Sequence, residues 1–162
     1  MTIALKLTHD EPRLVYLALV YHLGRPGSEL DPVTKQPVEH GLREVKTALG
    51  NDVASESAVI ELDDDQYRKL LLAIYGSVNE LRVHHMRGGA ESTVARFSET
   101  ARTLFPEVAH EPEAALDVAE AMMMLHRRIE RAVARAGAPA SPSGAPEGSE
   151  PPKGRPRWPF RR

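Results

Sequence analysis

The fold follows from residues 58–85, which read AVIELDDDQYRKLLLAIYGSVNELRVHH. Every second residue from Ala58 to Leu62 is apolar, which predicts one buried face of a short strand. Asp63 and Gln66 then place an N-cap oxygen three residues before a side chain that can reach back, which is a capping box. The apolar residues beyond that point recur every three or four positions. They predict an amphipathic helix that begins directly after the strand.

A weaker copy of this pattern lies 55 residues earlier in the chain. Residues 3–7 alternate as a strand does, and Thr8 with Glu11 predicts a second capping box. Residues 14–23 follow as a helix that is apolar nearly all round, which indicates a helix buried at the centre. Two short strands need a cover to be stable, so we expect them to pair with each other beneath helices, or to pair across a dimer.

Three further helices are expected from apolar spacing. They cover residues 39–49, 94–105 and 112–136, the last with Pro112 in its first turn and Gly137 just past its end. Residues 24–38 are interpreted as a long loop because they contain three prolines. The predicted fold class is therefore mostly α (α+β), with about five helices and two short strands from a weak strand–helix internal repeat.

The composition changes sharply near residue 137. Residues 1–136 are predicted to form one helix-rich globular domain. Residues 137–162 contain seven of the thirteen prolines and almost no aliphatic side chain large enough for a core. Such a segment cannot offset the entropy lost on ordering, so we predict a disordered Pro/Gly/Ser-rich basic tail.

Cysteine is absent from the chain, which excludes disulfides and thiolate chemistry. The first residues lack the basic region and cleavage site of a signal peptide, and no apolar run approaches the roughly 18 residues of a membrane span. We expect a soluble, cytoplasmic protein without a transmembrane segment.

Charge is distributed unevenly along the chain. The formal net charge is −2, but five basic and only two acidic residues follow position 136, which leaves 16 basic and 21 acidic residues in the body. A body with a net charge of −5 is a poor candidate for binding nucleic acid through its folded surface.

Seven histidines invite a search for metal ligands. The pairs spaced for a shared ion are Glu80 with His84, His126 with Glu130, and Glu107 with His110. Pairs four apart are common as surface ion pairs, and the third pair lies between Pro106 and Pro112 in an expected loop. His84 and His85 point about 100° apart on a helix and occupy its last turn, where the helix dipole favours them. We therefore predict no metal site.

Two acidic clusters could bind a cation or act as an acid–base pair, but neither fits such a site. Asp63–Asp65 lack the glycine of a calcium loop, and His9–Glu11 occupy the equivalent helix start, so capping explains both clusters. No Gly-rich phosphate loop and no nucleophile elbow occur. We expect no catalytic residue and no cofactor.

Three consecutive methionines, Met122–Met124, lie on the last predicted helix. Three successive residues span about 200° of a helix, so at least one of them, Met124, should leave the buried face. An exposed methionine beside a core stripe indicates a dimer or partner surface.

The sharpest local signal is KGRPRWPFRR, residues 153–162, where the only Trp and five cations are concentrated. Trp and Arg are typical binding anchors, and prolines lower the entropy lost on docking. The residues predicted to contact a partner are Arg155, Arg157, Trp158, Phe160, Arg161 and Arg162. Membrane contact, nucleic-acid contact and a purely solubilising role are the alternatives for this segment.

The predicted function is that of a non-enzymatic cytosolic interaction or adaptor protein. Its helical body would associate with itself or with another protein, and its tail would dock on a partner. One alternative is a nucleic-acid-associated protein that uses the basic aromatic tail as an electrostatic arm. Another is a metal-dependent enzyme that uses His84 and His126 with nearby carboxylates.

Overall fold

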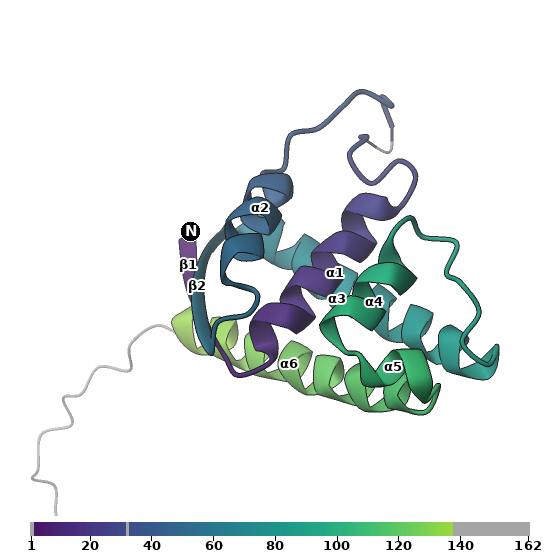
Figure 1. The fold of residues 1–162 in the computed structure, drawn as a ribbon. Coiled ribbons are helices and arrows are strands. Elements are labelled where there is room, and N and C mark those ends of the chain that lie inside the picture. Colours follow the sequence, from purple (N-terminus) through teal and green to yellow (C-terminus); the bar gives the residue numbers. More distant parts are fainter. Residues whose placement is uncertain (1, 32, 138–162) are drawn as a thin grey trace, which may run out of the picture.

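A computed structural model describes residues 2–31 and 33–137 of the chain (Figure 1). The elements are, in order, β1 (Thr2–Thr8), α1 (Glu11–Gly24), α2 (Leu42–Asp52), β2 (Ser57–Asp63), α3 (Asp64–Met86), α4 (Phe97–Leu104), α5 (Glu107–His110) and α6 (Ala114–Gly137). The predicted mostly helical fold with two short strands is confirmed. No helix among the described residues combines the length and apolar character needed to cross a membrane.

The two strands pair with each other, which confirms the first of the two pairings expected. They run antiparallel, with Leu5 opposite Ile60 and Leu7 opposite Ala58. These side chains are buried against the helices, whereas Val59 on the other face is 66% exposed. The alternation seen in the sequence is therefore the alternation between a covered and an open face of the two-stranded sheet.

The first helix, α1, lies at the centre of the molecule, as its all-round apolar character predicted. Figure 1 shows α3 behind α1 and α6 running beneath both, while α2 and α4 flank α1 on the nearer side. The side chains of Val15, Leu17, Ala18 and Leu19 are fully buried. Polar faces are found on the surrounding helices instead, which explains why α1 alone lacks an amphipathic pattern.

Close packing between α1 and α3 depends on Gly76. The ring of Tyr21 rests directly on this glycine, where any side chain would overlap it. The same ring meets Phe97 of α4 edge to face, with centroids 5.9 Å apart. Three helices are thereby joined around one aromatic side chain.

The two helix starts differ, although both were predicted to be capping boxes. Asp63 accepts hydrogen bonds from the amides of Asp65 and Gln66, and the Gln66 side chain accepts from the Asp63 amide, so the second box is complete. In the first copy Glu11 accepts from the Thr8 amide at 2.9 Å, but the N-cap is Asp10. The Thr8 prediction is therefore only half correct.

Several predicted boundaries shift where the backbone turns. Helix α2 begins at residue 42 rather than 39 because Gly41, at φ 70°, turns the chain there. Helix α4 begins after Arg96, at φ 62°. Helix α6 begins at Ala114, because the amides of residues 114–116 bond to carbonyls three residues back in a tight turn at Pro112.

One helix was not predicted. Residues 107–110, interpreted as a loop between two prolines, form the short helix α5, in which Pro106 serves as the N-cap. Proline is well tolerated at a helix start because the missing N–H has no helical partner there. The predicted tail beyond Gly137 lies outside the described residues.

Candidate functional site

The residues predicted to form a docking peptide all lie in the undescribed tail. Arg155, Arg157, Trp158, Phe160, Arg161 and Arg162 are therefore placed by the sequence alone. The candidate sites that the structure describes lie in the helical body.

Of the histidine–carboxylate pairs considered in the sequence, Glu80 and His84 bind other partners, whereas His126 and Glu130 contact each other. Glu80 accepts a hydrogen bond from Ser92 Oγ at 2.7 Å, and the buried His84 uses Nδ1 to donate to the carbonyl of Ala90 at 3.1 Å. His126 Nδ1 lies 3.3 Å from Glu130 Oε2 in an i,i+4 ion pair. Within residues 2–31 and 33–137, no three His, Asp or Glu side chains gather as metal ligands do.

The acidic helix starts serve the backbone and a tertiary contact. The carboxylate of Asp63 accepts the hydrogen bonds of its own capping box. Glu11 accepts from Arg128 Nε at 2.6 Å and from Arg128 Nη2 at 2.7 Å, which ties the start of α1 to the far half of α6. A bidentate pair of this kind fixes orientation as well as charge.

The three methionines divide as predicted. Met122 is fully buried, Met123 is partly buried, and Met124 is 55% exposed. Met124 lies in a hollow of about 400 Å³ between α6 and the turn that joins β1 to α1, called here the Met124 hollow. It is lined by Thr8, His9, Asp10, Glu11, Leu14, Ala121, Met124, Leu125, Arg128 and Arg131.

The Met124 hollow has an apolar base and a basic rim. Leu14 and Leu125 are almost completely buried beneath it. At the rim, the charge of Arg128 is neutralised by Glu11, whereas Arg131 donates to the carbonyl of Arg127 at 3.1 Å and forms no ion pair within the described residues. The arrangement can accept an apolar side chain and, next to it, a negative charge.

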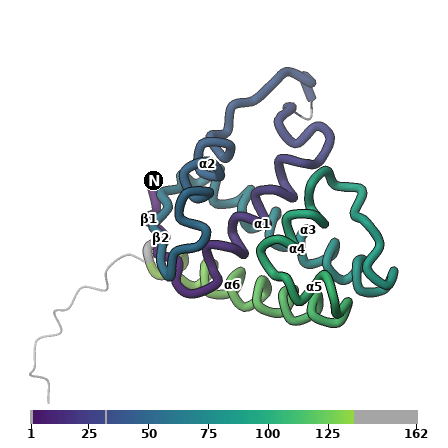
Figure 2. Tube along the Cα trace, in the orientation of Figure 1, coloured from purple at the N-terminus to yellow at the C-terminus, as the bar shows by residue number. Residues whose placement is uncertain are grey.

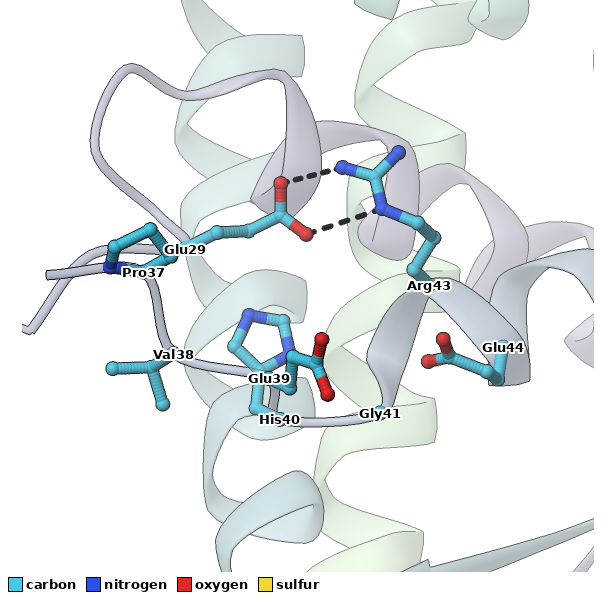
Figure 3. Close-up of a pocket in the computed structure, with 8 residues that line it drawn as sticks. All are labelled: Glu29, Pro37, Val38, Glu39, His40, Gly41, Arg43 and Glu44. Atoms are coloured by element: carbon cyan, nitrogen blue, oxygen red, sulfur yellow. Dashed lines mark hydrogen bonds and ion pairs between the residues drawn. The ribbon is translucent and has the colours of Figure 1, made fainter.

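A second hollow is lined by His40, one member of a histidine pair that sequence analysis did not single out. Figure 3 shows the hollow, of about 250 Å³, between the loop after α1 and the first turn of α2. Arg43 spans it, donating to both carboxylate oxygens of Glu29 at 3.2 and 2.5 Å. His40, which lines it, meets His22 of α1 edge to face, with ring centroids 5.2 Å apart.

One member of the pair, His22, is held in its neutral form. The pKa of His22 is lowered to about 4, chiefly by burial and then by the electrostatic effects of His40, Arg25 and Lys69, against a smaller opposite effect of Glu29. His40 Nδ1 accepts from the Leu42 amide at 3.3 Å, and the buried Nε2 atoms of both rings have no hydrogen-bond partner among the described residues. A single histidine inside an apolar helix, as at position 22, was the sequence signal that could have identified a buried titratable group.

Comparison with known proteins does not extend this description: no family model, no curated protein and no solved structure matches the chain. Functional inference therefore depends on the residues of the body and on the composition of the tail.

Proposed function

We propose that this chain is a non-enzymatic cytosolic interaction protein, whose helical body binds a partner protein through the Met124 hollow. One observation carries the proposal: Met124 is 55% exposed on α6, directly beside the buried Leu14 and Leu125. Apolar surface that continues from the core into an open hollow is typical of contact sites. The flexible thioether of methionine can adapt to the shape of an apolar group.

The charges around the Met124 hollow favour one kind of partner. Asp10 is paired with Arg13 and Glu11 with Arg128, so the acidic side chains of the rim are already neutralised. Arg131 lacks such a partner among the described residues. The best fit is a segment with a bulky apolar residue flanked by a carboxylate, because the apolar group would fill the hollow and the carboxylate would pair with Arg131.

The tail supplies a second contact in this proposal. Residues 153–162 combine one Trp, one Phe and five cations with prolines that favour an extended chain. Two weak contacts joined by a linker bind more tightly than either alone, because the second forms at high effective concentration. The body and the tail would thus hold one partner or bring two together.

The test for the body is capture of proteins from host lysate with the full-length chain, a Met124→Gln variant and a Leu72→Gln variant. Leu72 is 68% exposed on α3 outside the hollow, so it controls for the loss of any exposed apolar side chain. We expect the polar change at position 124 to weaken capture of a specific partner by about tenfold or more, which corresponds to about 1.4 kcal/mol. Equal capture by both variants would contradict the proposal.

Self-association is measured on the same proteins by sedimentation. A dimer that dissociates in Met124→Gln but persists in Leu72→Gln would identify a second copy of the chain as the partner. A chain ending at Gly137 separates the tail from the body. A partner that needs the tail and survives nuclease treatment would support the docking peptide.

A second candidate function has one observation in its favour. The last turns of α6 expose Arg127, Arg131 and Arg135, so the basic tail continues a basic helix end even though the body as a whole is acidic. Such a surface fits a nucleic-acid-associated protein. Binding to single-stranded nucleic acid that falls steeply with salt, and that disappears on deletion of residues 153–162, would favour this function over protein docking.

A further inference from the structure

A groove runs along the face of α1 that lies between α2 and α4. Two hollows, of about 420 and 450 Å³, adjoin there because Tyr16, Arg96 and Thr100 line both, and the two together are called the groove. Figure 2 shows α2 and α4 on either side of α1 in this region. The rest of the lining comes from the three helices and the segments next to them. Helix α1 contributes Val20, Leu23 and Gly24, and α2 contributes Arg43, Lys46, Thr47 and Gly50, with Val53 at its C-cap. Ala95 and three residues of α4, Glu99, Thr103 and Leu104, complete it.

Three cations from two segments line the larger hollow. Arg43 and Lys46 come from α2, and Arg96 comes from the turn before α4. Arg43 is engaged by Glu29, whereas Lys46 lies 5.5 Å from the centroid of the Tyr16 ring, a contact that leaves its charge uncompensated. Neither Lys46 nor Arg96 forms an ion pair with any residue that the structure describes. Two positive charges are therefore available in one polar groove.

The backbone at Arg96 is held in an unfavourable conformation. Its φ of 62° lies in the left-handed region, which costs a non-glycine residue about 1–2 kcal/mol. The residue before Arg96 packs closely on α1, since a Cβ added to Gly24 would lie only 2.7 Å from the carbonyl oxygen of Ala95. Strain of this kind persists where the surroundings impose it, and it is concentrated at functional sites.

The carboxylates described around the groove do not neutralise the cations of the larger hollow. Glu29 is already paired with Arg43, and the single carboxylate that lines the groove, Glu99, belongs to the smaller hollow and not to the larger one. Thr47 and Thr100 add hydroxyl groups beside the cations, and Val20 and Leu23 add apolar surface. Donors, positive charge and an apolar wall thus share one space.

We propose that this groove binds a small phosphorylated molecule, with its phosphate at Lys46 and Arg96 and its apolar part against Val20 and Leu23. The two unpaired cations match the two negative charges of a phosphate monoester. Arginine and lysine are the usual phosphate ligands in proteins, and the threonine hydroxyls can donate to the remaining oxygens. The volume of the groove lies within the range of small-molecule sites, about 300–1,000 Å³.

The test uses phenyl phosphate as the probe, with inorganic phosphate and phenol as comparators, in amide NMR titrations of the full-length protein. Phenyl phosphate should shift the amides of Thr47, Arg96 and Thr100 along a saturable curve. Inorganic phosphate should shift the same amides more weakly, and phenol should not produce this response. The site would then need both the charge and the apolar group.

Arg96→Gly is the decisive variant because it separates binding from folding. Glycine adopts φ 62° without strain, so the melting temperature should stay the same or rise while affinity for phenyl phosphate falls at least about tenfold. Lys35→Gly is the matched control, since Lys35 is also a cation at positive φ, 57°, but lies outside the groove. It should bind the probe as the unmodified protein does.

Lys46→Gln tests the second cation independently. This variant should also weaken binding of phenyl phosphate at least about tenfold. The proposal is overturned if either groove variant binds phenyl phosphate like the unmodified chain. It is also overturned if the saturable shifts fall on the exposed arginines of α6, or if no amide of the groove responds at roughly 10 mM probe.

Discussion

The two strand–helix copies form the same local structure with different partners. At the start of α3, Asp63 and Gln66 satisfy each other's backbone amides within four residues of chain. At the start of α1, Glu11 accepts from Thr8 nearby and from Arg128, which is 117 positions away. The second junction is complete by itself, whereas the first is completed only when α6 has packed. Similar sequences can therefore form one junction that depends on local hydrogen bonds and another that depends on a tertiary contact.

The same contrast recurs inside the two helices. The offset of 55 residues aligns Tyr21 and His22 with Gly76 and Ser77. Ser77 Oγ donates to the Ala73 carbonyl of its own helix at 2.8 Å, whereas the buried His22 Nε2 finds no partner in the part of the chain that the structure describes. The first copy again depends on its surroundings, and substitutions can measure by how much.

The largest effect is expected where the two copies touch. Gly76→Ala would drive a methyl group into the Tyr21 ring, so we expect the free energy of unfolding to fall by about 2–3 kcal/mol in urea denaturation. In a double-mutant cycle with Tyr21→Leu the two losses should be less than additive, since the smaller side chain leaves room for the methyl. A stabilised Gly76→Ala protein would show that the contact is not close.

Removal of the tertiary partner should cost more than removal of the local one. Glu11→Ala breaks the bidentate pair with Arg128 and the bond to the Thr8 amide, and we expect a loss of about 2 kcal/mol in the same assay. Arg13→Ala is the control, because Arg13 forms an exposed pair with Asp10 at the same helix start and should cost less than about 0.5 kcal/mol. Equal losses would remove the distinction between the two kinds of contact.

The histidine of the first copy should make stability depend on pH. The unfolded chain protonates His22 near pH 6.5 and the folded chain only near pH 4, so protons favour unfolding as the pH falls through this interval. From pH 8 to pH 5.5 this contribution is a loss of about 1.4 kcal/mol. Comparison of unfolding free energies should show that His22→Leu lacks this loss and that Ser77→Ala, at the aligned position, retains it.

The smallest effect is expected at the junction that is complete by itself. Asp63→Ala removes the acceptor of two amides and should cost about 1 kcal/mol. Asp63→Asn keeps an N-cap acceptor and should recover most of that loss. A cost for Asp63→Ala above that of Glu11→Ala would reverse the comparison between the two junctions.

Periodicity was sufficient to predict the two strands and helices α3 and α6, because each buries one continuous face, and α1 was predicted from its all-round apolar character. The alternation over residues 58–62 and the stripe along α3 are local signals, and neither needs knowledge of the partner surface. Helix α5 was missed because four residues between prolines are too few to show a period. The start of α4 was misplaced because nothing in the sequence around Arg96 indicates its left-handed backbone, at φ 62°.

Site features that lie on one helix could be predicted from the sequence, whereas those built from several elements could not. The exposure of Met124 followed from counting 100° steps along one helix, so the sequence was enough. The pairing of His22 with His40 needs the loop after α1 to return to the same helix, and the groove with Lys46 and Arg96 needs three elements in register. Contacts of that kind are made by tertiary packing and leave no spacing pattern in the chain.

The ion pair between Glu11 and Arg128 has a consequence for biosynthesis. A ribosome adds about 5–20 residues per second, so the guanidinium emerges on the order of ten seconds after the carboxylate it will bind. During that interval a nascent chain can form the bond from Thr8 to Glu11 but not the contact that secures α1 against α6. The side of α1 that faces α6 would therefore stay uncovered until the last helix is made, and a chaperone that shields this side would be most useful in those seconds.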